Sequence, residues 1–146
     1  SRRQRQMCIR DRWDTAARAH DIQLISLVPP NADADKIRRI SQHSEGYIYL
    51  MSRSGVTGTD RAAGMPTHHV VELMKDAGAP PALLGFGISK PEHVAEAMAH
   101  GVDGVIVGSA YVRIINENLN DDQALKSKLS SFTQQMKEAT CGRLLA

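Results

Sequence analysis

Glycine and serine residues follow two short apolar runs in positions where they could bind an anion. Gly87 follows the run 82–86, and Gly108 and Ser109 follow the run 102–107. Glycine lets an anion approach the backbone, and the free N–H groups at a helix start supply positive potential. These positions indicate a site for a phosphorylated ligand. Tight turns and close helix–strand packing are the structural alternative.

The loop that begins at Ser52 has the composition of an active-site lid. Thr57 lies between Gly55 and Gly58, and glycines permit the hinge motion of a closing loop. The Thr57 hydroxyl could bond a ligand or an active-site carboxylate. A plain surface loop is the alternative, and composition alone favours it.

Residue spacing gives no support to metal chemistry. His68 and His69 are adjacent, so on a helix they point about 100° apart and cannot chelate one ion together. Cys8 and Cys141 lie near opposite ends of the chain, and neither a C-x-x-C nor an H-E-x-x-H motif occurs. We therefore predict no metal site. Asp103 lies inside an expected strand, and we assign it an edge or buried polar role rather than a catalytic one.

Bulk composition is that of a globular protein. The chain has 146 residues, of which 42% are hydrophobic and 23% charged. No apolar run reaches the length of about 18 residues that a membrane span requires, so we expect no membrane partner. Because neither a disulfide framework nor a secretory segment is visible, we expect a cytoplasmic location.

Residues 1–12 differ in charge from the rest of the chain. They hold five Arg and one Asp, a net +4, which leaves −2 for residues 13–146 out of the total of +2. A basic arm can bind nucleic acid, but this one has no interleaved aromatic residues and no basic continuation. We expect no nucleic-acid partner. We interpret residues 1–12 as a non-native or disordered arm and residues 13–146 as one domain.

Strand and helix patterns alternate along that domain. Four short apolar runs predict buried parallel strands, at 24–28, 47–51, 82–86 and 102–107. Helical spacing and cap residues predict four helices. One can be capped by Asn31 and Asp33, one runs over 70–77 and is ended by Gly78, one is opened by a Ser89–Glu92 capping box, and one starts at about Asp121. Four βα units fit a doubly wound sheet or half of a (β/α)8 barrel, which needs about 250 residues.

Three segments resemble signature stretches of the tryptophan synthase alpha subunit family. They are SRSGVTG at 52–58, PALLGFGIS at 81–89 and GVIVGSA at 104–110, with LVPPNA at 27–32 as a fourth point of similarity. The match runs in order from about Ala16 to the last helix. The resemblance implies an α/β fold, with residues 13–146 as the C-terminal half of a (β/α)8 TIM barrel, namely barrel strands 5–8 with their helices.

This resemblance also implies an activity. The family cleaves indole-3-glycerol phosphate to indole and glyceraldehyde 3-phosphate, a retro-aldol lyase reaction of tryptophan biosynthesis. It further implies a tryptophan synthase beta chain as partner in an alpha2-beta2 heterotetramer. The beta chain uses pyridoxal phosphate to condense indole with serine, whereas the alpha chain is expected to need no cofactor.

By motif position, the resemblance assigns roles to nine residues. Those placed at the phosphate are Gly58, Gly87, Gly108 and Ser109. Those that line the apolar pocket for the indole or the propyl phosphate are Tyr49, Phe86 and Ile106. Thr57 would lie on the closing loop and contact a catalytic aspartate, with Arg53 at the base of the loop.

The acid and base of this family are a glutamate and an aspartate in its first half, which nothing in this sequence resembles. General acid–base catalysis needs such groups to move protons. We therefore expect no catalytic residue in this chain, with Thr57 in a supporting role, and no lyase activity from the chain alone. The alternatives are a non-catalytic phosphate-binding half barrel and another phosphate-binding barrel of amino-acid biosynthesis.

Overall fold

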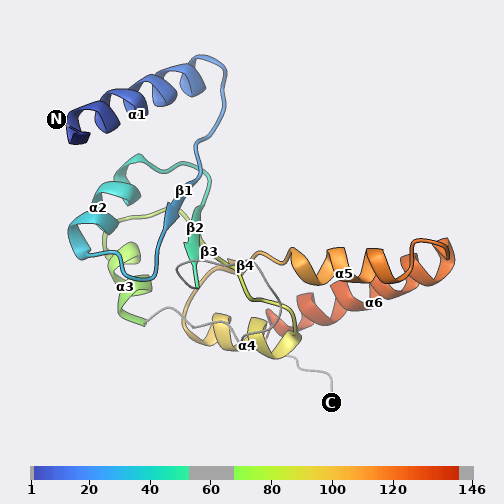
Figure 1. The fold of residues 1–146 in the computed structure, drawn as a ribbon. Helices are drawn as coiled ribbons and strands as arrows, with labels where there is room; N and C mark the ends of the chain where they lie inside the picture. Colours follow the sequence, from blue (N-terminus) through green and yellow to red (C-terminus); the bar gives the residue numbers. More distant parts are fainter. Residues whose placement is uncertain (1, 53–67, 142–146) are drawn as a thin grey trace.

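The computed structural model describes residues 2–52 and 68–141, with side chains from residue 11 onward (Figure 1). Within these ranges the chain forms six helices and four strands. In chain order they are α1 (Arg2–Ala19), β1 (Ser26–Val28), α2 (Ala34–His43), β2 (Ile48–Met51), α3 (His68–Asp76), β3 (Ala82–Gly85), α4 (Pro91–Ala99), β4 (Gly104–Val105), α5 (Ser109–Glu117) and α6 (Asp122–Ala139).

The four strands form one parallel sheet in the order β1-β2-β3-β4. Each strand is followed by a helix, which confirms the predicted α/β class. A doubly wound sheet reverses its strand order at a switch point, whereas consecutive strands of a (β/α)8 barrel stay in sequence order. The uninterrupted order therefore favours the barrel alternative.

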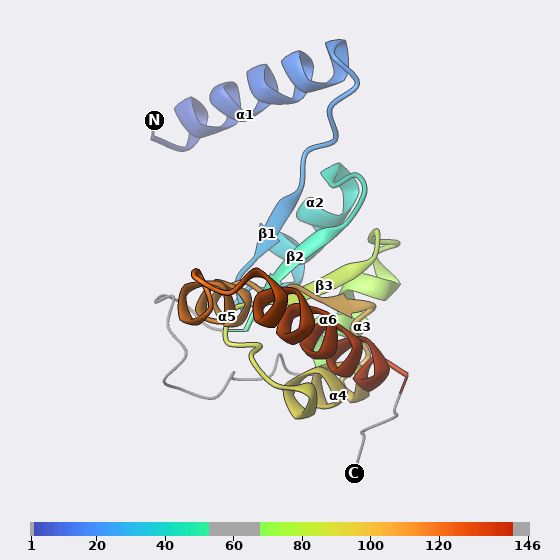
Figure 2. The same ribbon diagram turned by 90° about the vertical axis from the view of Figure 1, so that its right-hand side faces the viewer.

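One face of the sheet carries the hydrophobic core. Val28, Leu50 and Leu84 are fully buried and pack with apolar side chains of the flanking helices, among them Ile37 of α2 and Val94 of α4. Figure 2 shows the helices beside the twisted strands. Because side chains alternate along a strand, their neighbours point to the other face.

The opposite face of the sheet has one row of paired residues that none of the described helices fully covers. Leu27 pairs with Tyr49, Tyr49 with Leu83, and Leu83 with Gly104. Tyr49 and Leu83 are half-buried, and Leu27 is 54% exposed. In a closed barrel the corresponding face points to the interior, so the open row lies where a barrel core would be.

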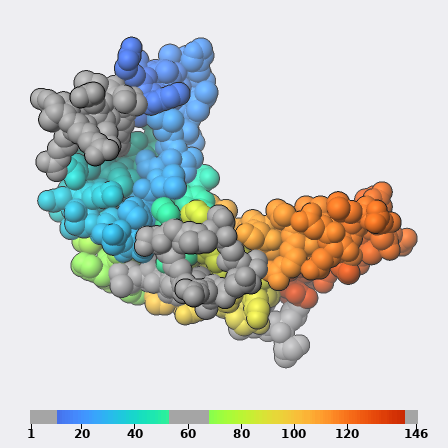
Figure 3. All heavy atoms as spheres, viewed as in Figure 1, coloured from blue at the N-terminus to red at the C-terminus, as the bar shows by residue number. Residues whose placement is uncertain are grey.

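Helices α5 and α6 lie side by side and extend away from the sheet (Figures 1 and 3). Tyr111 of α5 meets Phe132 of α6 edge to face, with ring centroids 5.0 Å apart. Three large apolar residues face solvent here: Val112 (55% exposed) and Ile115 (37%) on α5, and Leu119 (64%) in the connection between the two helices.

Helix α1 lies at the opposite extremity from α5 and α6 (Figure 1). Residues 2–12, predicted as a separate arm, form the first part of this helix. The domain boundary at residue 13 stays a prediction. None of the helices described here has the length and apolar character needed to cross a bilayer.

Several predicted boundaries are confirmed by their caps. The Asp33 carboxylate accepts a hydrogen bond from the Lys36 N–H at 2.7 Å, and the Asp121 carboxylate accepts one from the Ala124 N–H at 2.9 Å. Gly78 ends the α3 region with a φ of +67°. Such caps satisfy backbone groups left free at helix ends. Because the capping residue lies within a few residues of those groups, the local sequence predicts it.

The predicted Ser89–Glu92 capping box is wrong. Helix α4 begins at Pro91, its N-cap is Lys90, and no side chain caps it. Proline prefers the first helical position because its φ is fixed and it has no N–H to satisfy, so Pro91 places the helix start one residue later than the box requires. The Ser89 N–H instead donates to Nδ1 of His93 at 3.3 Å.

The strand predicted at 102–107 is also shorter than expected. Only Gly104 and Val105 are paired in β4. Beyond them the Ile106 N–H still donates to the Leu84 carbonyl at 2.8 Å. The apolar run therefore continues beside β3 toward α5, although it is not regular strand to its end.

Candidate functional site

Six of the nine residues assigned to the site lie in the described ranges, and they gather at one edge of the sheet. They are Tyr49, Phe86, Gly87, Ile106, Gly108 and Ser109. Tyr49 belongs to β2, and the other five follow the carboxyl ends of β3 and β4. Since all strands are parallel, these ends meet at the same edge, where ligands bind in parallel α/β folds. Arg53, Thr57 and Gly58 lie outside the described residues.

The turn after β3 has a strained backbone. Phe86 has a φ of +69° and Gly87 a φ of +77°. Glycine adopts positive φ freely, but for a bulky residue this conformation is an outlier that costs on the order of 1–3 kcal/mol. Such strain persists only where neighbouring groups hold it, and it is concentrated at functional sites.

Ser52 is the neighbour that holds this turn. Its N–H donates to the Gly85 carbonyl at 3.2 Å, and its hydroxyl donates to the Phe86 carbonyl at 2.6 Å. Ser52 is only 4% exposed. One residue at the end of β2 therefore bonds two successive carbonyls at the end of β3.

Tyr49 forms an apolar wall with Phe86. Their rings meet edge to face, with centroids 5.6 Å apart and planes at 66°. A Cβ at Gly85 would collide with the Tyr49 ring and hydroxyl, so glycine there makes room for the tyrosine. Burial raises the pKa of the Tyr49 hydroxyl, neighbouring Tyr47 raises it further, and a hydrogen bond with the Phe86 backbone acts in the opposite direction. The wall thus carries an uncharged hydroxyl at neutral pH.

The start of α5 provides the second anion-suited element. Gly108 is its N-cap, and no side chain bonds the helix start. Gly108 and Ser109 are exposed, and a Cβ at Gly108 would meet nothing within 4 Å. The first N–H groups of a helix and its dipole favour an anion in such open space. Because β3 and β4 are neighbours, this helix start and the Phe86–Gly87 turn leave the sheet from adjacent strands.

The described residues give less support to metal binding or to a catalytic role for Asp103. Among the described residues, no group of three or more His, Cys, Asp or Glu could hold a metal ion. Asp103 precedes β4, at the amino edge of the sheet, and its carboxylate accepts a hydrogen bond from the Ala82 N–H at 2.8 Å. The predicted edge role of Asp103 is therefore confirmed, although the residue is exposed rather than buried.

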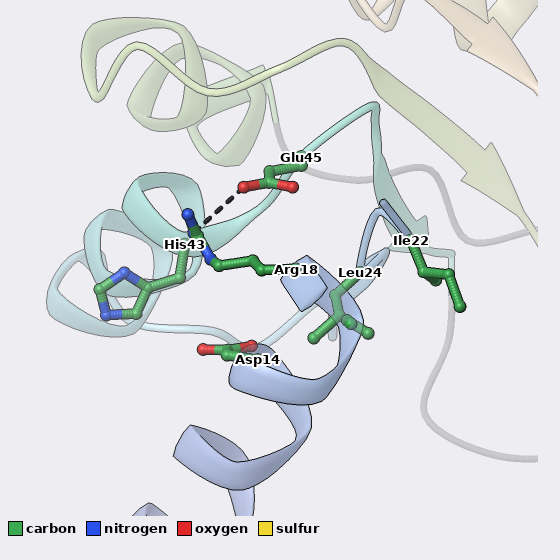
Figure 4. A pocket seen from close by; sticks show the side chains of 7 residues that line it. Asp14, Arg18, Ile22, Leu24, His43 and Glu45 are labelled. Atoms are coloured by element: carbon green, nitrogen blue, oxygen red, sulfur yellow. Dashed lines mark ion pairs between the residues drawn. The ribbon is translucent and has the colours of Figure 1, made fainter. Parts of the chain in front are cut away.

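A surface hollow at the amino edge is shown in Figure 4. Arg18 of α1 and Glu45, which precedes β2, form an ion pair across it at 3.0 Å. The Arg18 side chain is 67% exposed and the Glu45 side chain 41%, so the pair contributes at most about 1 kcal/mol. The residues that line it are Asp14, Ala17, Arg18, Ile22, Leu24, His43 and Glu45. The hollow lies between α1 and the α2–β2 connection, at the opposite edge of the sheet from the six site residues.

Ser52 is the site residue that sequence reasoning missed. The sequence identifies it only as the first residue of the lid-like loop and of the SRSGVTG segment. A serine after a buried strand is a weak signal by itself. Its role depends on a partner 34 residues away, and nothing in the local sequence predicts that pairing.

Comparison with known sequences identifies the family of the chain. The family model for the tryptophan synthase alpha chain matches residues 10–141. The tryptophan synthase alpha chain of Shewanella oneidensis is 47% identical over 125 residues, which are 86% of this chain and 45% of that protein. The one from Salmonella paratyphi B is 46% identical over 125 residues, 86% of this chain and 47% of its own length. The chain thus spans about half the length of these relatives.

Solved structures agree with this match. A variant tryptophan synthase alpha subunit from Pyrococcus furiosus superposes with a TM-score of 0.66 at 28% identity, covering 91% of this chain and 50% of that one. The tryptophan synthase a2b2 complex of the same organism gives 0.64 at 29% identity, covering 90% and 50%. The fold is that of the C-terminal half of a (β/α)8 barrel, and the chain belongs to the tryptophan synthase alpha chain family.

Proposed function

We propose that the chain forms the phosphate-binding side of an active site that cleaves indole-3-glycerol phosphate to indole and glyceraldehyde 3-phosphate. One observation carries the proposal: two anion-suited turns leave adjacent strands beside an aromatic wall. Gly87 and the Gly108–Ser109 helix start suit a phosphate, and Tyr49 with Phe86 suits a flat apolar ring. Indole-3-glycerol phosphate joins these two chemical features in one molecule.

Each element has a physical task in this proposal. The start of α5 attracts the phosphate dianion, a contribution on the order of 0.3–1 kcal/mol that rises to about 2 kcal/mol when partly buried. Tyr49 and Phe86 would contact the indole, and Ile106, which follows β4, would add to the apolar lining. Arg53, Thr57 and Gly58 would close over the bound substrate, as the family resemblance implies.

We further propose that the catalytic acid and base come from elsewhere in a complete alpha chain. A carboxylate that does follow a described strand end, Asp33 after β1, is occupied as the cap of α2. The chain alone is therefore expected to bind the substrate without turning it over. The lyase step needs proton transfer to the indole ring and from a glycerol hydroxyl, which carboxylates would perform.

A tryptophan synthase beta chain is the proposed partner. The support is that one matched structure is the tryptophan synthase a2b2 complex of Pyrococcus furiosus. Pyridoxal phosphate would belong to that partner, and we propose that the alpha chain itself uses no cofactor and acts in the cytoplasm. The second candidate function is a phosphate-binding half barrel without catalysis. The observation that favours it is that the Asp33 carboxylate, which follows β1, bonds the Lys36 N–H as a helix cap.

Calorimetric titration tests the binding part of this proposal. The chain should bind both indole-3-glycerol phosphate and inorganic phosphate, and Ser109→Ala should weaken both affinities about three- to tenfold through loss of a hydroxyl and its hydrogen bond. Because Ser109 is exposed, its replacement should leave the melting temperature unchanged.

Ser44→Ala is the matched control. The Ser44 hydroxyl bonds the Ile40 carbonyl at the end of α2, so its loss should not affect either affinity. Equal affinities for wild type and Ser109→Ala, or equal weakening by both variants, would contradict the proposed phosphate site.

A further inference from the structure

Two peptide planes flank Phe86, and a single residue bonds both. The Gly85 carbonyl belongs to the plane before Phe86, and the Phe86 carbonyl belongs to the plane after it. Ser52 donates its N–H to the first at 3.2 Å and its hydroxyl to the second at 2.6 Å. Fixing both planes fixes both backbone dihedrals of Phe86, because the peptide units themselves are rigid.

This arrangement explains how a phenylalanine keeps a φ of +69°. Without a constraint, the chain would relax toward negative φ, where a bulky side chain avoids steric conflict. The Ser52 hydroxyl is well placed to prevent this, because Ser52 is 4% exposed and its hydrogen bond is partly shielded from water.

The same bond sets the direction of the Gly87 N–H. In a trans peptide the carbonyl and the following N–H point in opposite directions. Since the Phe86 carbonyl points to Ser52, which follows β2, the Gly87 N–H points away from Ser52. That N–H is one of the groups assigned above to the phosphate, so its direction matters for binding.

We propose that Ser52 is a positioning residue of the phosphate site, whose hydroxyl holds the strained Phe86–Gly87 peptide so that the Gly87 N–H is directed at the anion. The inference rests on the proposed function for its ligand, but the geometry of the turn can be measured independently. Ser52 touches no substrate in this account and acts only through the Phe86 backbone.

The test compares Ser52→Ala with Ser41→Ala in the full chain. Ser41 is an equally buried serine, 5% exposed, whose hydroxyl donates to the Ile37 carbonyl at 2.8 Å inside α2. NMR reports the sign of φ at Phe86, because a strong intraresidue amide-to-α-proton Overhauser effect marks positive φ. Titration with inorganic phosphate, followed by the Gly87 and Ser109 amide shifts, reports affinity.

Ser52→Ala should weaken the Phe86 Overhauser effect and the phosphate affinity together, the latter about tenfold. Ser41→Ala should change neither, although it removes a comparable buried hydrogen bond. Ser52→Thr retains the hydroxyl and should bind phosphate within about twofold of wild type.

A second comparison does not depend on whether threonine fits. In a Phe86→Gly background, Ser52→Ala should have a smaller effect on phosphate affinity, because glycine adopts positive φ without strain. An unchanged turn and affinity in Ser52→Ala would overturn the inference, as would equal weakening by Ser41→Ala. If wild type fails to bind phosphate, the proposed function fails, and the Overhauser measurement alone decides the role of Ser52.

Discussion

Positive φ angles occur at both edges of the sheet, but only at the carboxyl edge does a bulky residue have one. At the amino edge, the helix-to-strand connections place them on three glycines and one small polar residue: Gly46, Gly78 and Gly101, with φ of +74°, +67° and +86°, and Asp21, with φ of +53°. At the carboxyl edge, the turn after β3 places them on Gly87, at +77°, and on Phe86, at +69°. Glycine adopts this conformation freely, whereas phenylalanine needs external support.

The support at the carboxyl edge comes from another strand. Ser52 bonds the Gly85 and Phe86 carbonyls, and the Tyr49 ring lies against Gly85. At the amino edge, the Asp103 carboxylate bonds the Ala82 N–H and simply completes the sheet. This division follows the rule for (β/α)8 barrels, in which the carboxyl face carries function and the amino face stability.

Gly85→Ala should produce the largest effect among substitutions that test this comparison. A Cβ at Gly85 collides with the Tyr49 ring, so unfolding free energy should fall by about 3 kcal/mol, the upper end for overpacking. Urea denaturation measures the loss. Tyr49→Ala in the same chain should recover most of the Gly85→Ala cost, and failure to do so would remove the contact as its cause.

Gly78→Ala should cost less, about 1–2 kcal/mol, because only the left-handed backbone opposes it. A Cβ at Gly78 would meet nothing within 4 Å. Urea denaturation again gives the value, and phosphate affinity should stay at the wild-type level. A cost equal to that of Gly85→Ala would break the contrast between the two edges.

Asp103→Ala should have the smallest effect, a loss of about 1 kcal/mol from one hydrogen bond to a backbone N–H. Phosphate affinity should not change, because Asp103 lies at the amino edge. Asp103→Asn retains an acceptor oxygen and serves as the control, with a smaller loss of stability. Weaker phosphate binding in Asp103→Ala would contradict the assignment of this edge to stability.

Local chemistry made much of the fold predictable from sequence. Of the two predicted caps, Asn31 and Asp33, it is Asp33 that caps α2, and Gly78 ends the α3 region as predicted. Both residues satisfy helix ends from within a few residues. The parallel strands followed from short apolar runs. The predicted capping box is wrong because α4 starts at Pro91. The preference of proline for the first helical position outweighs the Ser89–Glu92 pattern.

The site was only partly predictable. Gly108 and Ser109 could be placed at a helix start, because a glycine that precedes an apolar helical segment is a local signal, and their role in anion binding stays a prediction. The left-handed Phe86 could not, because its conformation depends on Ser52, 34 residues earlier in sequence. The backbone strain at Phe86 therefore depends on a contact with Ser52, and the residues next to Phe86 in sequence do not predict it.

An indole-release assay with indole-3-glycerol phosphate tests the central claim most directly. The purified chain should release no indole by itself, and should do so when the N-terminal half of a related alpha chain is added. Ser109→Ala should reduce that restored activity. Turnover by the purified chain alone would contradict the proposal that the catalytic acid and base come from elsewhere. No indole from a mixture whose two halves demonstrably associate would contradict the proposal that this chain supplies the phosphate-binding side of the site.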